Sequence, residues 1–220
     1  MKQLDEIEVR VLGSLIEKQL ATPEYYPLTM NALVRACNQL SNREPVVNYD
    51  ERTVTQAIES LREKSLVYIF YGSDSRVPKY KQMFAEQLHL SQPEVAIICV
   101  LMLKGTQTVG ELRAATNRLY EFADLNEVEA TLEKLLVQDD PALVVRLPRR
   151  AGQKEARYAH LLSGEVRIEE TEKVSPAERA LSSSSNRDER IAALEAEVEA
   201  LKGQLEELRR KFEEFSRQFE

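Results

Sequence analysis

Few residues of this chain have the types and spacing that catalysis requires. The two histidines, His89 and His160, lie far apart and belong to no recognisable nucleophile arrangement. The cysteines, Cys37 and Cys99, have no Cys or His nearby at metal-ligand spacing, so we expect buried free thiols and neither a disulfide nor a metal site. The seven glycines are scattered singly and form no phosphate-binding loop. The sequence therefore predicts a protein that is not an enzyme and has no cofactor.

Basic and amide side chains suited to nucleic acid are the main chemical signal. Arginine can donate two hydrogen bonds to guanine and glutamine can pair with adenine, so Arg52 and Gln56 are candidate base readers. Two basic hairpin turns are suited to phosphates or to a narrow minor groove. Charged hairpin tips also occur where they only meet solvent, and both interpretations stay open. The candidate DNA-binding residues are Arg43, Arg52, Gln56, Arg76, Lys79, Lys81, Arg146, Arg149, Arg150, Lys154 and Arg157.

The distribution of charge argues against a simple DNA-binding protein. The net charge is −7, and acidic residues outnumber basic ones in each of the segments 1–87, 88–165 and 166–220. Non-specific DNA affinity comes from neutralising phosphates and releasing their counterions, which usually needs a basic excess. A protein-interaction scaffold is therefore the alternative to DNA binding.

The elements that must position these residues follow a pattern that occurs twice, in residues 5–82 and 91–161. Each copy predicts a capped apolar helix, a short extended piece, two more helices and two strands around a basic turn. This order is typical of a winged helix-turn-helix domain. In the first copy the buried side of the first helix is expected to be Ile7, Val11, Leu12, Leu15 and Ile16, and the strands are expected at Leu66–Tyr71 and Val77–Met83.

The second copy has clearer helix starts. Three capping-box pairs each precede an apolar helical periodicity: Ser91 with Glu94, Thr108 with Glu111, and Asp124 with Glu127. Its strands are expected at Leu143–Leu147 and Ala156–Leu161. The outer side of its third helix is acidic, which disfavours contact with a DNA duplex and favours a protein partner or solvent.

The C-terminal part has a different composition. Residues 165–187 contain too few apolar residues to fold alone and are predicted to form a flexible linker. Residues 188–220 carry heptad spacing typical of a coiled-coil helix, which predicts a homodimer. Three large Phe residues near the end leave another oligomer or intramolecular docking open. The expected contact positions are Ile191, Leu194, Val198, Leu201, Leu205, Leu208, Phe212, Phe215 and Phe219.

Several ungapped strings of the chain resemble the YceH-like family of bacterial proteins of unknown function. The resemblance covers about residues 4–164 and implies a tandem winged-helix fold without implying a ligand. The strings that carry it are Glu8–Lys18, Tyr26–Thr29, Ala36–Gln39, Ser41–Arg43, Gly105–Thr108, Gly110–Arg113, Arg157–Tyr158, His160–Leu161 and Ser163–Gly164.

These observations predict an α+β, mainly α, protein with winged helix-turn-helix domains at 1–87 and 88–164, followed by the linker and the coiled-coil helix. No apolar run approaches the roughly 20 residues that cross a bilayer, and the N-terminus lacks the pattern of a signal peptide, so we expect a cytoplasmic protein without membrane contact. The predicted function is binding of double-stranded DNA, in a regulatory role and as a dimer. The alternative is a protein scaffold without DNA contact.

Overall fold

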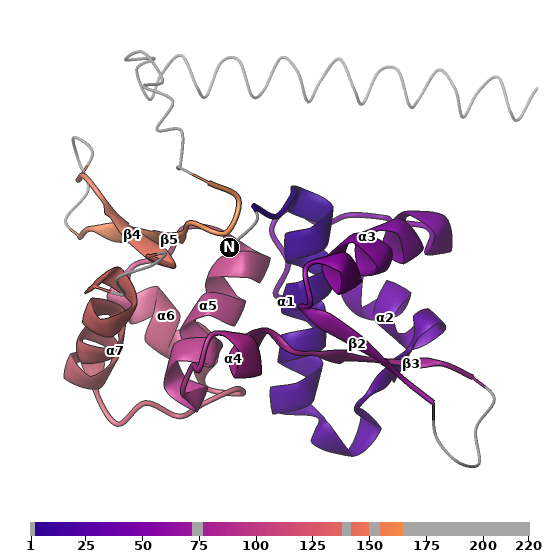
Figure 1. Ribbon diagram of the computed structural model, residues 1–220. Helices are drawn as coiled ribbons and strands as arrows, with labels where there is room; N and C mark the ends of the chain where they lie inside the picture. The colour runs from indigo at the N-terminus through magenta and orange to yellow at the C-terminus, as the bar shows by residue number, and fades with distance from the viewer. Residues whose placement is uncertain (1–2, 72–76, 138–141, 150–154, 165–220) are drawn as a thin grey trace, which may run out of the picture. The chain divides into compact units, whose positions relative to one another are not determined.

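The computed structural model describes residues 3–71, 77–137, 142–149 and 155–164 (Figure 1). These residues belong to one compact unit, residues 1–167. The predicted linker and coiled coil, and with them every proposed oligomerisation residue, lie outside the described residues. The predicted boundary after residue 87 coincides with the end of a short helix.

The described part of the first repeat contains three α-helices and three strands, and a polar cap precedes each helix. Asp5 and Glu8 form a capping box on the first helix, Thr29 accepts from Ala32 N at the second, and Asp50 accepts from Thr53 N at the third. The elements are α1 (Glu6–Ala21), the 3-10 helix η1 (Pro23–Tyr25), β1 (Leu28–Thr29), α2 (Met30–Cys37), α3 (Glu51–Glu63), β2 (Val67–Phe70) and β3 (Lys79–Gln82).

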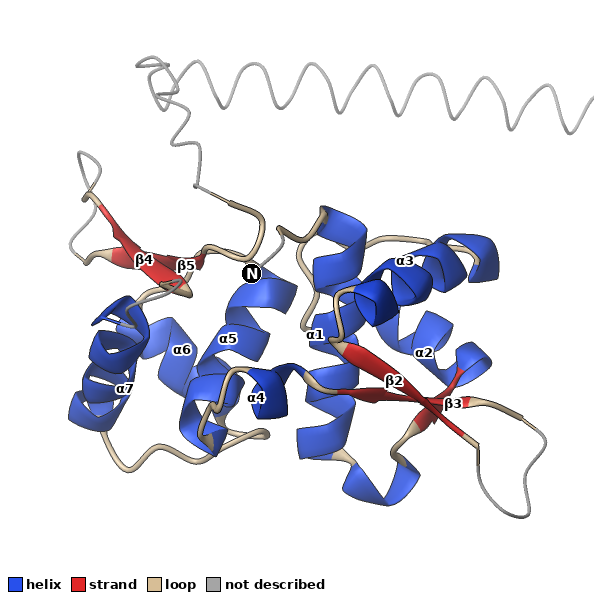
Figure 2. Ribbon diagram, in the orientation of Figure 1, coloured by secondary structure: helices blue, strands red, loops and turns tan. Residues whose placement is uncertain are grey.

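The second repeat follows a short connecting helix, α4 (Phe84–Gln87), and has the same order of three helices and two strands, but its described residues include no counterpart of the helix η1 or the strand β1 (Figure 2). The predicted capping boxes at Ser91 and Thr108 are present. Asp124 accepts from Glu127 N, but the Glu127 carboxylate accepts from Ala123 N instead of closing the predicted box. The elements are α5 (Gln92–Lys104), α6 (Val109–Thr116), α7 (Leu125–Val137), β4 (Val144–Leu147) and β5 (Arg157–His160).

The strands form two small antiparallel sheets. In the first repeat the order is β1-β3-β2, with Leu28 opposite Tyr80 and Ile69 opposite Tyr80 on the other side. In the second repeat β4 pairs with β5, and Gln107 bridges to Tyr158 just before α6, in the position that β1 has in the first repeat. The predicted strands are confirmed, each slightly shorter than expected, and the coarse α+β class is confirmed with them.

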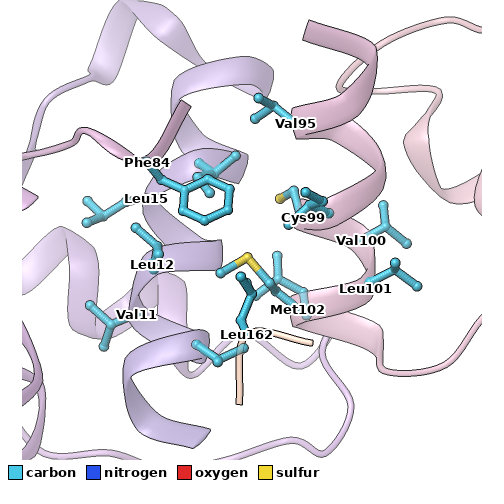
Figure 3. Packing of buried hydrophobic residues seen from close by; sticks show 14 of the residues in the cluster. Val11, Leu12, Leu15, Phe84, Val95, Cys99, Val100, Leu101, Met102 and Leu162 are labelled. Atoms are coloured by element: carbon cyan, nitrogen blue, oxygen red, sulfur yellow. The ribbon is translucent and has the colours of Figure 1, made fainter. Parts of the chain in front are cut away.

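The two repeats share one hydrophobic core, which lies between α1 and α5 (Figure 3). Gly13 permits close contact of these helices, because a Cβ there would lie 3.0 Å from Leu103 Cδ2. Phe84 and Leu162 also enter this interface. The N-terminus closes the unit, since Leu4 N donates to Leu162 O at 2.8 Å.

Candidate nucleic-acid interface

The outer side of α3 carries the two candidate base readers near its N-terminus. Val54, Ala57, Ile58 and Leu61 are buried, and this places Arg52 and Gln56 on the opposite, exposed side. Glu59 and Glu63, one and two turns further along, are exposed as well. The helix therefore presents polar and cationic groups at its start and carboxylates towards its end.

The other candidate cationic groups near this helix differ in how exposed they are. Arg35 is exposed on α2, which contacts α3. Lys79 and Lys81 are half-buried on β3, and Lys81 Nζ lies 2.8 Å from Glu86 Oε1. Arg76 lies outside the described residues. Within the described residues, the exposed cations of this region are thus Arg35, Arg52 and, near the end of α3, Arg62, and Lys79 is partly accessible.

Arg43 is placed differently from its prediction as a DNA contact. Its side chain is fully buried, with Nη2 2.6 Å from Glu17 Oε2. Its remaining guanidinium groups donate to the carbonyls of Ala36 and Asn42. A guanidinium with its donors occupied inside the protein has no group available for a phosphate, so the prediction for Arg43 is wrong.

The reason for this burial is an ionic network that sequence reasoning missed. Glu17 is also buried and accepts from Arg118 Nη2 at 3.3 Å, so the network joins the two repeats. Arg10 is buried nearby and donates to the carbonyls of Cys37 and Pro45. Desolvation by burial, and next the charge of Arg43, lower the pKa of Arg10. Glu17 and Arg10 lie on the side of α1 that its apolar stripe would assign to solvent.

The basic residues of the second repeat are only partly available. Arg146 and Arg149 are exposed, whereas Arg150 and Lys154 lie outside the described residues. Arg157 donates to Thr106 O at 2.9 Å and to Glu111 Oε1 at 3.1 Å. It therefore supports the junction of β5 and α6, where it lines a polar cleft of about 870 Å³.

The outer side of α7 is acidic, as expected. Glu129 and Glu133 are exposed there together with Asn126 and Ala130, and Lys134 supplies one exposed cation. Val137 at the end of the helix is 74% exposed. A duplex would meet repulsion along this side, so α3 and α7 present different chemistry despite equivalent positions in the repeats.

The groups considered for catalysis or redox chemistry are mostly withdrawn from solvent. Cys37 and Cys99 are free and buried, as predicted, and burial raises the pKa of the Cys37 thiol to about 11. Burial lowers the pKa of His160 to about 4. Its imidazole is therefore neutral at physiological pH, and its buried Nδ1 has no hydrogen-bond partner in the described residues.

Comparison with known proteins places the chain in an uncharacterised bacterial family. Residues 4–153 match the family described as "Protein of unknown function, DUF480". The chain is 50% identical over 191 residues to a UPF0502 protein of Opitutus terrae, covering 87% of this chain and 83% of that protein. It is 52% identical over 196 residues to one of Solibacter usitatus (89% and 91%), and 47% identical over 199 residues to one of Vibrio atlanticus (89% and 90%).

The chain belongs to this DUF480 family and is similar to these UPF0502 proteins over most of its length. The expected resemblance to an uncharacterised bacterial family is confirmed. Within the described residues, the structure contains no helix long and apolar enough to cross a membrane.

Proposed function

We propose that this protein binds double-stranded DNA in a regulatory role, with each repeat acting as a winged helix and residues 188–220 joining two copies. The sheet order β1-β3-β2 behind three helices supports the winged-helix interpretation of the first repeat. We propose a binding protein and not an enzyme, in the cytoplasm.

The observation that carries the proposal is the exposure of Arg52 and Gln56 at the start of α3. In helix-turn-helix proteins the N-terminal residues of the recognition helix contact base edges. Arg35 on α2 and Lys79 on β3 are suited to the flanking phosphates. The carboxylates of Glu59 and Glu63 restrict the contact to the first turns of the helix.

The test is binding of the full chain to a random duplex, measured by fluorescence anisotropy at about 50 and about 200 mM salt. We expect affinity that falls steeply with salt. Once the preferred site is known, Arg52→Ala with Gln56→Ala should weaken binding to it by roughly 1–3 kcal/mol for each base-reading side chain removed. For the same variant, the loss of affinity for a random duplex should be smaller than the loss of affinity for the preferred site.

Lys134→Ala is the matched control, because it removes one exposed cation from the acidic side of α7. It should leave binding unchanged. No binding at the lower salt concentration, or equal losses in the two variants, would contradict the proposal.

A second candidate is a protein scaffold that uses the second repeat. The acidic side of α7 ends at the exposed Val137, and Leu125 at its start is also exposed. Such a surface suits a partner with basic and apolar groups. A stoichiometric protein partner that co-purifies after nuclease treatment, and no longer does so with Glu129→Lys and Glu133→Lys, would favour this function over DNA binding.

A further inference from the structure

The strand β2 is an edge strand of its sheet. Within the described part of the chain, the order β1-β3-β2 leaves it paired on one side only, with β3. Residues Val67–Phe70 also contain no proline or charged residue, and their register with β3 is continuous. Natural edge strands are usually protected by charges, proline or bulges, so this edge lacks the common protection against pairing.

The hydrogen-bond pattern shows which backbone groups face the open edge. Met83 N donates to Leu66 O at 2.8 Å, and bonded pairs alternate along an antiparallel ladder. Tyr68 and Phe70 are therefore bonded to β3, and the N–H and C=O groups of Val67 and Ile69 point away from it. The other side of β3 shows the same alternation. Gln82, which lies opposite Val67, points its N–H away from β2 and donates to the Tyr26 hydroxyl at 2.6 Å.

A groove of about 820 Å³ lies beside this open edge. The residues of this edge that line it are Ser65, Val67, Tyr68, Ile69 and Tyr71. The end of α3 forms the other wall. An extended strand can therefore approach β2 without first displacing another element of the described chain.

The side chains of β2 make this edge apolar. Tyr68 is 59% exposed and Phe70 45% exposed, and both lie on the same side of the sheet, opposite Lys81 and Lys79. Tyr71, which follows the strand, is 67% exposed. Aromatic residues at this density favour cross-strand pairing over solvent.

We propose that β2 pairs antiparallel with β2 of a second copy of this chain, about a two-fold axis at Ile69. In this register Ile69 lies opposite its own copy, Tyr68 opposite Phe70, and Val67 opposite Tyr71. The outward backbone groups then bond to each other, and two aromatic pairs form on the exposed side. This self-pairing does not depend on DNA binding.

The absence of charge along β2 favours a second copy as the occupant, because pairing the strand with itself brings no like charges together. Arg62 lies between Glu59 and Glu63 in the groove wall, and none of the three has an ion-pair partner in the described residues. These three groups are therefore available to a partner chain that enters the groove. Arg52 lies about 15 Å from Arg62 along α3, so pairing at the end of the helix leaves this proposed base reader uncovered.

The test is amide hydrogen exchange of the full chain, resolved residue by residue by NMR. Self-pairing predicts slow exchange at Val67, Ile69 and Tyr71, in addition to the protection that β3 gives Tyr68 and Phe70. Dimerisation through residues 188–220 alone would leave the three outward amides in rapid exchange. Rapid exchange of Val67 and Ile69 at high protein concentration would overturn the proposal.

The matched variant is Tyr68→Glu with Phe70→Glu. Within one chain the new carboxylates lie opposite Lys81 and Lys79, which keeps the sheet intact, but across the two-fold axis they face each other and repel. Exchange at Val67 and Ile69 should accelerate ~10-fold or more, while the amides at positions 68 and 70 stay protected by β3.

Tyr25→Glu serves as control, because Tyr25 is an exposed aromatic on η1, outside the groove. It should leave the exchange of Val67 and Ile69 slow. Equal exchange of these amides in the wild type and in the Tyr68→Glu, Phe70→Glu variant would also overturn the self-pairing.

Discussion

Arg43 and Glu17 show how single residues hold the two repeats together. Both are buried and lie 2.6 Å apart, and Glu17 also reaches Arg118 of the second repeat. A buried ion pair adds little over apolar packing, but removing one partner leaves an uncompensated charge in a poor solvent. Arg43 is therefore a structural residue, although its type and loop position resemble those of a phosphate contact.

Arg43→Met should destabilise the protein by about 3–5 kcal/mol, because the Glu17 carboxylate and the Ala36 carbonyl lose their buried donor. Urea unfolding followed by circular dichroism measures this. Arg118→Met is the control: its side chain is 58% exposed, so about 0–1 kcal/mol is expected. Equal destabilisation in the two variants would contradict a structural role specific to Arg43.

At the scale of elements, a second buried carboxylate links α1 to α3. Glu8 closes the capping box at the start of α1 and accepts from Lys64 Nζ, at the end of α3, at 2.6 Å. Burial alone raises the pKa of Glu8, but the hydrogen bonds from Lys64, Ser60 and the Asp5 N–H together outweigh burial and lower it. Lys64 thus links the C-terminus of α3 to the N-terminus of α1 through an ion pair.

Lys64→Met should cost roughly 1.5–3 kcal/mol at neutral pH, through loss of a charged hydrogen bond. Because the folded pKa of Glu8 is lowered, its contribution is present above the unfolded value of about 4.5 and is lost as pH falls through the folded pKa. The difference between variant and wild type should therefore shrink in acid. Thermal unfolding between pH 7 and pH 3 tests this.

Lys81→Met is the control for this prediction, since the side chains of Lys81 and of its ion-pair partner Glu86 are 37% and 57% exposed. It should change stability by about 0–1 kcal/mol. A Lys64→Met penalty that stays constant down to pH 3 would show that the contact acts by packing and not through the ionised carboxylate.

At the scale of the whole molecule, the crossing of α1 and α5 makes the repeats one folding unit. The helices meet at Gly13, where Cys99 Sγ lies 3.5 Å from the Gly13 carbonyl oxygen. α5 is apolar on all sides, and nine of its residues are buried. Separating the repeats would expose this apolar contact to water at a large cost in free energy. We therefore expect the two repeats to unfold cooperatively.

Gly13→Val should lower stability by about 1–3 kcal/mol, because the added carbons overlap Leu103 and Met102 across the interface. Differential scanning calorimetry measures the change and shows whether a single transition remains. Gly110→Ala on α6 is the control: a Cβ there meets nothing within 4 Å, so we expect unchanged or slightly raised stability. Tolerance of valine at Gly13 would contradict close packing of the repeats.

Much of the secondary structure could be predicted because its signals are local. The caps Asp5, Thr29, Asp50 and Thr108 each form a hydrogen bond within the next three residues. The short helices η1 and α4 were not predicted, since neither is long enough to show an apolar period. The candidate base readers Arg52 and Gln56 lie on the exposed side of α3, because that helix contacts the core along one stripe.

The sequence by itself determined the order of the helices and strands and the repetition of that order, because caps and apolar periodicity act over a few residues. Only the tertiary structure decided the burial of Arg10, Glu17 and Arg43. The loop after α2 and the second repeat together cover α1 on the side where its own sequence places charges. The open edge of β2 depends in the same way on which strand is its neighbour. Whether a residue is exposed depends on the elements that pack against it, and a local sequence pattern does not specify those elements.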